Sequence, residues 1–285
     1  MKTDRFHLQI IPTKNILIHE EFDPSRSSDL IEKFKKSNLL TEPIIAASLG
    51  DHQYLQLDGM NRLNCFKKLG LKTIMAQVVD YNNQEEVELS SWIHLFQSKR
   101  EDFFKHIKKD KNLTIKKANI DQIGPRYIKE KDFGRLVTVV DKKEGSFLVM
   151  TAGSFIDKVK RMNYVVSFYE NIINRSILPF TLTSRNIRLF FQEHPHLNFY
   201  DTPDTNLMIV FPNFTPQQII EVVRNGALVP AGITRHLIKG RCLNVNVPLT
   251  FFDNKKSLAQ LNRDFDRFLL KKAIRVYEES TIYFE

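Results

Sequence analysis

The chain has 285 residues, of which 42% are hydrophobic and 26% charged, so it can form a folded core and is not a disordered or low-complexity chain. Its 42 Lys and Arg against 33 Asp and Glu give a net charge of +9, which makes nucleic acid a partner to consider. Two cysteines are too few for a disulfide scaffold or a thiolate zinc cluster, and no apolar stretch is long enough for a signal peptide or a membrane span, so we expect a soluble cytoplasmic protein.

The first eighty residues alternate short apolar runs with helical patterns. Strands are predicted at 7–11, 43–49, 54–57 and 73–79, with a further short apolar run at 16–18. Helices are predicted from Asp23 or Ser27 to about residue 37, and over 60–69, where Gly70 would end the second helix. This alternation of strands and helices predicts a small α/β domain that ends near residue 90.

Residues 91–285 are predicted to form a second domain of mixed helices and strands, which makes the fold class of the whole chain α+β. The strands are expected at 135–140, 147–151, 207–211 and 243–249, and the helices at 101–109, 154–174, 215–225 and 257–279. The helix at 215 has the best start signal, because Thr215 can cap it, Pro216 suits its first position and Gln218 completes a capping box.

Most of the positive charge lies in one segment, residues 99–143, which holds fourteen Lys and Arg and seven Asp and Glu. This segment therefore supplies +7 of the net +9. Such a run usually forms a solvated face of a protein. The alternative is that it binds DNA through contacts to the phosphate backbone.

The most informative motif is Asp58-Gly59-Met60-Asn61-Arg62, in which a predicted strand ends in an acid and a helix follows a glycine. The free N–H groups at the start of the helix, from Gly59 to Arg62, can hold a phosphate group. Arg62 can add a bidentate contact, and Asp58 can hold a divalent cation such as Mg²⁺. The alternative is a plain strand–turn–helix in which Asp58 caps the helix and pairs with Arg62.

This strand-Asp-Gly-x-x-Arg-helix pattern, about forty residues after Ile16-Leu17-Ile18-His19-Glu20, resembles the ParB/sulfiredoxin superfamily. Sulfiredoxins place a reactive Cys in the turn, where this chain has Met60. ParB partition proteins carry a second Arg at the turn, where this chain has Asn61, and a helix-turn-helix domain that we do not find in the sequence. A third branch, the free L-serine kinases, resembles the chain more closely.

Three further segments resemble those of the free L-serine kinases. Residues 17–22 are similar to the segment with the family's catalytic glutamate, which aligns on Glu20. Residues 229–236 and 240–245 are similar to a C-terminal segment that binds the carboxylate of the amino acid. In this chain the carboxylate-binding positions are Thr234, Arg235 and His236. Trp92 lies in a segment that more weakly resembles one lining the serine site.

The chemistry of these residues agrees with the roles that the resemblance implies. A glutamate at the edge of a strand can accept a hydroxyl proton, although Glu20 could also be a surface residue in an acidic pair with Glu21. Thr234, Arg235 and His236 offer a hydroxyl, a fork of N–H donors and a ring N–H, which suit a carboxylate. The alternative for these three residues is a solvated loop.

The resemblance implies a ParB/sulfiredoxin-like nucleotide-binding domain at 1–90 and a substrate-binding domain at 91–285. The expected reaction transfers a phosphoryl group from ATP or ADP, with Mg²⁺, to the hydroxyl of L-serine. Its product, O-phospho-L-serine, would enter the synthesis of cysteine or of a diaminopropionate-containing siderophore.

Two alternatives to the kinase remain open at this point. One is a ParB-like DNA-binding regulator that uses residues 99–143. The other is a nucleotide-binding scaffold without catalysis, because Asn61 stands where the family turn usually has a His and cannot become a cation. The sequence does not separate ATP from ADP as the donor, and it does not define an oligomeric state.

Overall fold

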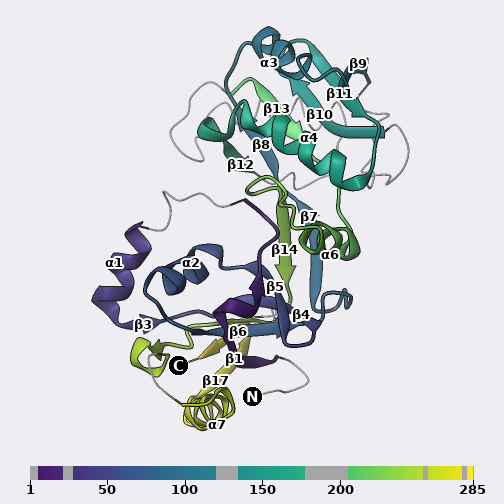
Figure 1. The fold of residues 1–285 in the computed structure, drawn as a ribbon. Coiled ribbons are helices and arrows are strands. Elements are labelled where there is room, and N and C mark those ends of the chain that lie inside the picture. Colours follow the sequence, from purple (N-terminus) through teal and green to yellow (C-terminus); the bar gives the residue numbers. More distant parts are fainter. Residues whose placement is uncertain are drawn as a thin grey trace. The chain divides into compact units, whose positions relative to one another are not determined.

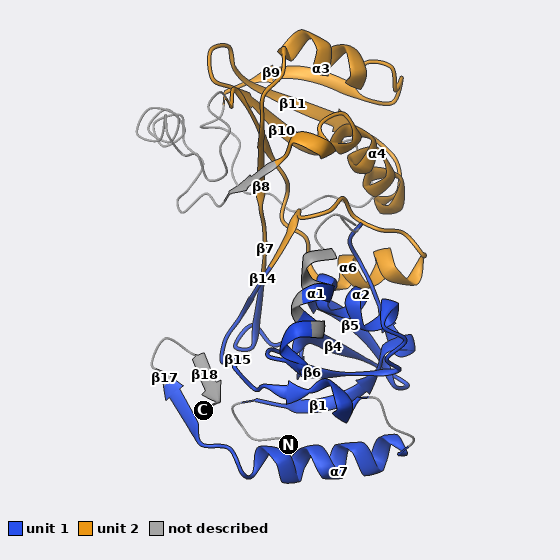
Figure 2. Ribbon diagram, turned by 90° about the vertical axis from the view of Figure 1, so that its left-hand side faces the viewer, with its two compact units in different colours: residues 1–88, 236–285 blue, residues 89–235 orange. Residues whose placement is uncertain are grey.

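The computed structural model divides into two compact units, residues 1–88 with 236–285 and residues 89–235 (Figures 1 and 2). The residues that the structure describes are 6–21, 28–119, 134–176, 205–252, 256–277 and 281–284. The first boundary lies close to the expected one at residue 90, but residues 236–285 belong to the first unit instead of the second. The Asn262 side chain accepts from the backbone N–H of Ile10 at 2.8 Å and donates to its carbonyl at 3.0 Å. Local sequence patterns carry no signal for such a distant contact.

The first unit is built on a five-stranded sheet with the strand order β1-β6-β4-β5-β2. The parallel pairs are β4 with β6 and β2 with β5, and the other neighbours are antiparallel. The predicted strands are confirmed, with the bounds β1 (Leu8–Pro12), β2 (Ile16–Leu17), β4 (Ile44–Gly50), β5 (Gln53–Asp58) and β6 (Thr73–Val79).

Helices cover both faces of this sheet, with α1 and α2 on one side and α7 on the other (Figures 1 and 2). Their bounds are α1 (Ser28–Ser37), α2 (Met60–Lys68) and α7 (Leu258–Leu269). Phe66 of α2 and Phe265 of α7 are fully buried members of one apolar cluster with the strands. Most strand residues of this cluster come from β1, β4 and β6, so the core forms around these strands.

Two predicted elements in the C-terminal part differ from the structure, one in its length and one in its continuity. The helix predicted to reach residue 279 ends at Leu269, where its apolar stripe ends, and the chain continues as β17 (Ile274–Tyr277) and β18 (Thr281–Phe284). The strand predicted at 243–249 is divided into β15 (Arg241–Leu243) and β16 (Val247–Pro248). Asn244 and Asn246 between them have φ angles of 55° and 54°, a left-handed backbone that cannot continue a strand.

The second unit contains an antiparallel six-stranded sheet with the order β12-β8-β13-β10-β11-β9. Its strands are β8 (Ile93–Phe96), β9 (Thr114–Ala118), β10 (Gly134–Asp141), β11 (Gly145–Thr151), β12 (Asn174–Ser176) and β13 (Leu207–Val210). The predicted hairpin of β10 and β11 is confirmed, and the described part of the basic segment forms α3 (Arg100–Ile107), β9 and β10. β9 was not expected.

The other helices of this unit are α4 (Phe155–Ser167) and α6 (Pro216–Arg224). The capping box predicted for α6 is confirmed, because Thr215 accepts from the Gln218 N–H and Gln218 accepts from the Thr215 N–H. The helix predicted over 154–174 ends at Ser167 and is followed by a short 3₁₀ turn and β12.

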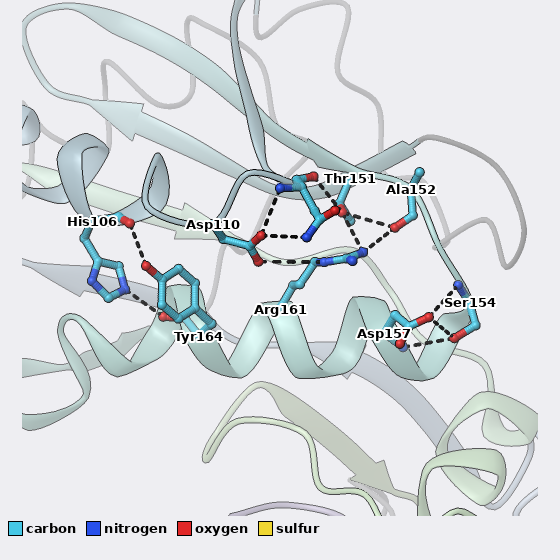
Figure 3. Close-up of polar contacts among 9 residues, drawn as sticks. His106, Asp110, Thr151, Ala152, Ser154, Asp157, Arg161 and Tyr164 are labelled. Atoms are coloured by element: carbon cyan, nitrogen blue, oxygen red, sulfur yellow. Dashed lines mark hydrogen bonds and ion pairs between the residues drawn. The ribbon is translucent and has the colours of Figure 1, made fainter.

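Polar contacts fasten α4 to the neighbouring segments of the second unit (Figure 3). The Tyr164 hydroxyl donates to the His106 carbonyl at 2.7 Å. Arg161 donates to Thr151 Oγ1 at 2.9 Å and its Nε lies 3.8 Å from a carboxylate oxygen of Asp110. These contacts fix the helix against the end of α3 and the end of β11, which is a structural role.

The remaining short strands are β3 (Leu39–Leu40), β7 (Val87–Ser91) and β14 (Thr234–Ile238). β7 and β14 pair with each other, and each contains one of the two points at which the chain passes from one unit to the other. Across the described residues, no helix has both the length and the apolar character that are required to cross a membrane.

Candidate active site

The turn between β5 and α2 has the strand–turn–helix form that the sequence predicts. Gly59 has a φ of 90°, and a Cβ atom there would lie 2.8 Å from Arg62 Nη2 and 2.9 Å from Ile44 Cγ2. A side chain at this position would therefore displace the guanidinium of Arg62. Within the described structure, no side chain caps α2 and the buried Arg62 Nε has no hydrogen-bond partner. The start of the helix thus keeps unused N–H donors.

Asp58 contacts two arginines through the same carboxylate oxygen. Its Oδ2 lies 2.6 Å from Arg241 Nη1 and 3.6 Å from Arg62 Nη2. Burial raises the pKa of Asp58, but Arg62, Arg241 and the Gly59 amide outweigh that effect and hold the pKa below its usual value. Asp58 pairs with Arg62, as the plain strand–turn–helix alternative predicts. It does not cap the helix, because the N-cap of α2 is Gly59.

Glu20 lies beside His19, in a cluster of aromatic and acidic side chains within the first unit. Its Oε1 is 3.9 Å from His19 Nε2, and its side chain is 19% exposed. The His19 ring makes an edge contact with the His236 ring, at 5.3 Å between centroids. The Tyr81 hydroxyl lies 2.8 Å from His236 Nε2. The charges of Glu20 and Asp58 act on this cluster, since Glu20 raises the pKa of Tyr81 and Asp58 that of His236.

Both histidines of the cluster are held by carbonyl groups of β5. His19 Nδ1 lies 2.9 Å from the carbonyl oxygen of Gln56, and His236 makes a hydrogen bond to the carbonyl of Leu57. Burial lowers the pKa of His19 and lowers that of His236 well below its usual value, so both rings are neutral near pH 7.

The partners of His236 define its tautomer. A neutral imidazole has one N–H, which His236 needs at Nδ1 in order to donate to the Leu57 carbonyl. Its Nε2 then accepts from the Tyr81 hydroxyl. Both ring nitrogens of His236 therefore have protein partners within the first unit.

The arrangement around Asp58 fits a magnesium ion that is held mainly by phosphate groups. Mg²⁺ commonly binds through one or two carboxylates together with substrate phosphates and water. Asp58 supplies one ionised carboxylate, and among the described residues no three His, Cys, Asp or Glu side chains form a metal cluster. Asp58 would therefore hold such an ion only together with oxygen atoms of a bound ligand.

In the second unit, the structure brings Trp92 and Arg235 together. The Arg235 guanidinium lies over the Trp92 ring, 5.4 Å from its centroid, and the backbone N–H of Trp92 donates to the Ile233 carbonyl at 3.0 Å. Thr234 is buried, with 7% of its surface exposed. Thr234 and Arg235 belong to the second unit and His236 to the first, so the predicted Thr-Arg-His stretch falls at the boundary between them.

Comparison with known proteins shows relatives along almost the whole chain. No family model matches it. It is 24% identical over 282 residues to the ATP-dependent L-serine kinase SbnI of Staphylococcus aureus, which covers 98% of this chain and 97% of that protein. The ATP-dependent L-serine kinase of Staphylothermus marinus is 23% identical over 247 residues, or 84% of this chain and 89% of that protein. The chain is therefore similar to ATP-dependent L-serine kinases along almost its whole length.

Two solved structures of serine kinases have the same fold as this chain. C-terminally truncated SbnI from Staphylococcus aureus matches with a TM-score of 0.67 and 20% identity, over 93% of this chain and 96% of that chain. A free serine kinase in complex with AMP matches with a TM-score of 0.64 and 17% identity, over 88% and 95%. The predicted α+β fold class is therefore confirmed, and so is the predicted resemblance to the free L-serine kinases.

Sequence reasoning missed three residues that contact predicted site residues, namely His19, Tyr81 and Arg241. It also missed Gln77, whose side chain bonds the backbone on both sides of Arg241. His19 and Arg241 lie inside the segments that carried the family resemblance, so a signal for them was present. Tyr81 and Gln77 had none, because nothing in their local sequence indicates a partner 155 or 165 residues away.

Proposed function

We propose that the protein is a free L-serine kinase that transfers a phosphoryl group from ATP to the hydroxyl of L-serine, giving O-phospho-L-serine and ADP. The observation that carries this proposal is the set of contacts that links Glu20, through His19 and His236, to the end of β5. Glu20, the proposed proton acceptor, and the turn from Asp58 to Arg62 thus belong to one compact unit. The names of the two relatives support ATP as the donor over ADP.

The turn between β5 and α2 would hold the nucleotide phosphates. The N–H groups of Met60 and Asn61 and the guanidinium of Arg62 would be its donors, and the start of the helix favours negative charge. Asn61 can donate a hydrogen bond where the family usually has a His, without adding a charge. Mg²⁺, bound by Asp58 and the phosphates, would neutralise charge on the group that is transferred.

Glu20 would accept the proton of the serine hydroxyl. As the proton moves to a Glu20 carboxylate oxygen, the serine oxygen forms a bond to the γ-phosphorus and the bond between that phosphorus and the bridging oxygen of ADP breaks. General base catalysis of this kind contributes about 10²–10⁴ in rate. His19 lies beside Glu20, and its bond to the Gln56 carbonyl holds the His19 ring in place next to the carboxylate.

Thr234, Arg235 and Trp92 would bind the amino acid. The Arg235 fork suits the carboxylate, and its contact with the Trp92 ring limits the positions that the guanidinium can take. His236 differs from the other two members of the stretch, because its ring nitrogens already bond Leu57 and Tyr81. Binding the carboxylate with this ring would require one of those bonds to break.

Incubation with L-serine, Mg²⁺ and either ATP or ADP tests the proposal, with O-phospho-L-serine detected by mass spectrometry. We expect product from the wild type, and a loss of product in Glu20→Ala. Glu32→Gln removes an exposed carboxylate from α1 and serves as the matched control, with activity unchanged. The absence of product from the wild type with both nucleotides would reject the kinase.

DNA binding through residues 99–143 is a second candidate function. The described part of this segment carries exposed lysines on and after α3 and on β9, among them Lys105, Lys108, Lys109, Lys116 and Lys117. Binding to duplex DNA should weaken with salt, with a logarithmic slope of about −0.9 for each phosphate contact. Absence of binding at moderate salt, or a flat salt dependence, would exclude this function.

The destination of the product and the location of the protein stay predictions. O-phospho-L-serine would enter the synthesis of cysteine or of a diaminopropionate-containing siderophore. A cytoplasmic location agrees with Cys65 and Cys242, which are both buried and are not joined in a disulfide.

A further inference from the structure

Arg241 lies at the start of β15, in the same unit as the phosphate-type turn but 183 residues away from Asp58 in sequence (Figure 2). Its Nη1 donates to Asp58 Oδ2 at 2.6 Å, a shorter distance than the 3.6 Å from Arg62 Nη2 to the same oxygen. Two guanidinium groups therefore meet at the residue that precedes the helix start. The Asp-Gly-x-x-Arg motif of the turn includes Arg62 but gives no role to Arg241.

The backbone on both sides of Arg241 is fixed by one buried side chain. The Gln77 amide nitrogen donates to the Gly240 carbonyl at 3.0 Å, and its oxygen accepts from the Cys242 N–H at 2.9 Å. Gln77 is 2% exposed and Cys242 is 1% exposed. A buried amide that satisfies both of its polar ends on the residues flanking Arg241 sets where this arginine can point.

Stability alone is a weak reason for this arrangement. The side chains of Arg241 and Asp58 are 33% and 41% exposed, and ion pairs at that exposure contribute little to the free energy of folding. The guanidinium has five N–H donors, and one of them contacts Asp58 in the hydrogen bond described above. The other donors stay at a partly exposed position next to the start of α2.

The charges around the turn are balanced before a ligand binds. Arg62 also lies 3.5 Å from a Glu42 carboxylate oxygen, so two guanidinium groups face two carboxylates. The unpartnered Arg62 Nε, within the described residues, and the start of α2 add donors without adding a carboxylate. The turn therefore has N–H donors that the two carboxylates do not occupy and that an anion could bind.

We propose that Arg241 is a further nucleotide-phosphate-binding residue of this site, and that Asp58 and Gln77 position it. The inference rests on the proposed function, because it assumes that the turn holds a nucleotide. With Arg62 on the helix and Arg241 on β15, two forks of donors contact the phosphates from two separate segments of the unit. The chain segment 236–285 thus contributes to nucleotide binding.

Binding measurements without metal test this proposal apart from catalysis. The dissociation constants of adenosine, AMP, ADP and ATP are measured by calorimetry in EDTA for the wild type, Arg241→Met and Arg241→Lys. For Arg241→Met we expect affinity for ADP and ATP to fall about tenfold or more, the range for a lost hydrogen bond to a charged group, and adenosine binding to stay unchanged. Arg241→Lys keeps the charge without the fork and should recover part of the affinity.

Arg267→Met is the matched control, because Arg267 is 74% exposed on α7 and pairs with Asp264. It should bind every ligand as the wild type does. Wild-type affinity for ATP and ADP in Arg241→Met, or an equal loss for adenosine, would overturn the proposal. If Arg241→Met does not fold, unchanged ADP and ATP affinity in Arg241→Lys would overturn it instead.

The outcomes also separate this inference from the kinase assignment. Product formation by the wild type together with normal nucleotide binding by Arg241→Met rejects the role of Arg241 alone. Weakened nucleotide binding in Arg241→Met without any product from the wild type rejects the kinase alone. A wild type that binds none of the phosphorylated nucleotides rejects both.

Discussion

The Tyr81 hydroxyl donates to His236 Nε2 at 2.8 Å and thereby joins β14 to the segment that follows β6. Burial raises the pKa of Tyr81, and Glu20 raises it further, so the hydroxyl keeps its proton over the whole physiological range. The other ring nitrogen of His236 donates to the Leu57 carbonyl, so with the Tyr81 bond both ring nitrogens have a partner. The Leu57 carbonyl thus sets the tautomer of His236, and Tyr81 satisfies the remaining ring nitrogen.

Tyr81→Phe should destabilise the protein by about 1–3 kcal/mol, since it removes the hydroxyl of a buried tyrosine and leaves Nε2 of the half-buried His236 without that donor. Urea unfolding monitored by circular dichroism measures this change. Tyr54→Phe is the control, because Tyr54 is only half-buried and water can replace its bond with the Gln9 amide. Equal stability of Tyr81→Phe and the wild type would contradict the described bond.

Stability should fall as the pH decreases from about 6.5 to 5. The pKa values of His19 and His236 are lowered in the folded state, so below the unfolded value near 6.5 the unfolded chain binds more protons than the folded chain. The stabilising contribution of the neutral rings is present above that pH and is lost below it. The urea midpoint measured at intervals between pH 7.5 and 5 reports the trend.

His236→Gln removes one of these two groups, and its urea midpoint should depend less steeply on pH than that of the wild type. Asp58, whose pKa is also lowered, contributes in a separate range, because its stabilisation is lost only near and below the ordinary pKa of a carboxylate. A wild-type midpoint that is constant from pH 7.5 to 5 would show that the rings are not held neutral.

Gly59→Ala should weaken nucleotide binding as well as stability. The left-handed backbone costs about 1–2 kcal/mol for a residue with a Cβ, and the clash with Arg62 and Ile44 adds about 1–3 kcal/mol. Gly145→Ala is a close control, with a φ of 91° and no heavy atom of the described structure within 4 Å of the added Cβ. Comparing the two variants by thermal unfolding and ADP binding isolates the effect of the contact with Arg62.

Asp58→Asn should lower kinase activity and raise the Mg²⁺ concentration needed for half of the maximal rate. The increase should be roughly tenfold or more, since weakened metal sites commonly lose about 10- to 100-fold in affinity. Arg241→Met is the comparison, because it removes the same ion pair without removing the carboxylate. An equal magnesium requirement in Asp58→Asn and the wild type would exclude Asp58 as a ligand.

Elements with strong local signals could be predicted from the sequence. The capping box of Thr215 and Gln218 located α6, and the strand, acid and glycine around Asp58 located the turn and α2. The family segments led to Glu20 and Arg235 before their surroundings were known. Each of these depends on residues that are close together in the chain, where propensity and capping act directly.

The contacts that complete the candidate site depend on distant parts of the chain and could not be predicted in the same way. Arg241 meets Asp58, and Tyr81 meets His236, across 183 and 155 residues. The last helix was expected in the second domain, but Asn262 holds it to β1 in the first unit. Long-range packing of this kind leaves no periodic or capping pattern in the sequence from which it could be predicted.

The most direct test of the account is a ³¹P NMR time course of the wild type with ATP, Mg²⁺ and L-serine. We predict that the γ-phosphate signal of ATP decreases while the signals of O-phospho-L-serine and ADP rise in equal amounts, and that Glu20→Gln slows this change by about 10²–10⁴. Release of free phosphate without O-phospho-L-serine, or a Glu20→Gln rate equal to that of the wild type, would contradict the account.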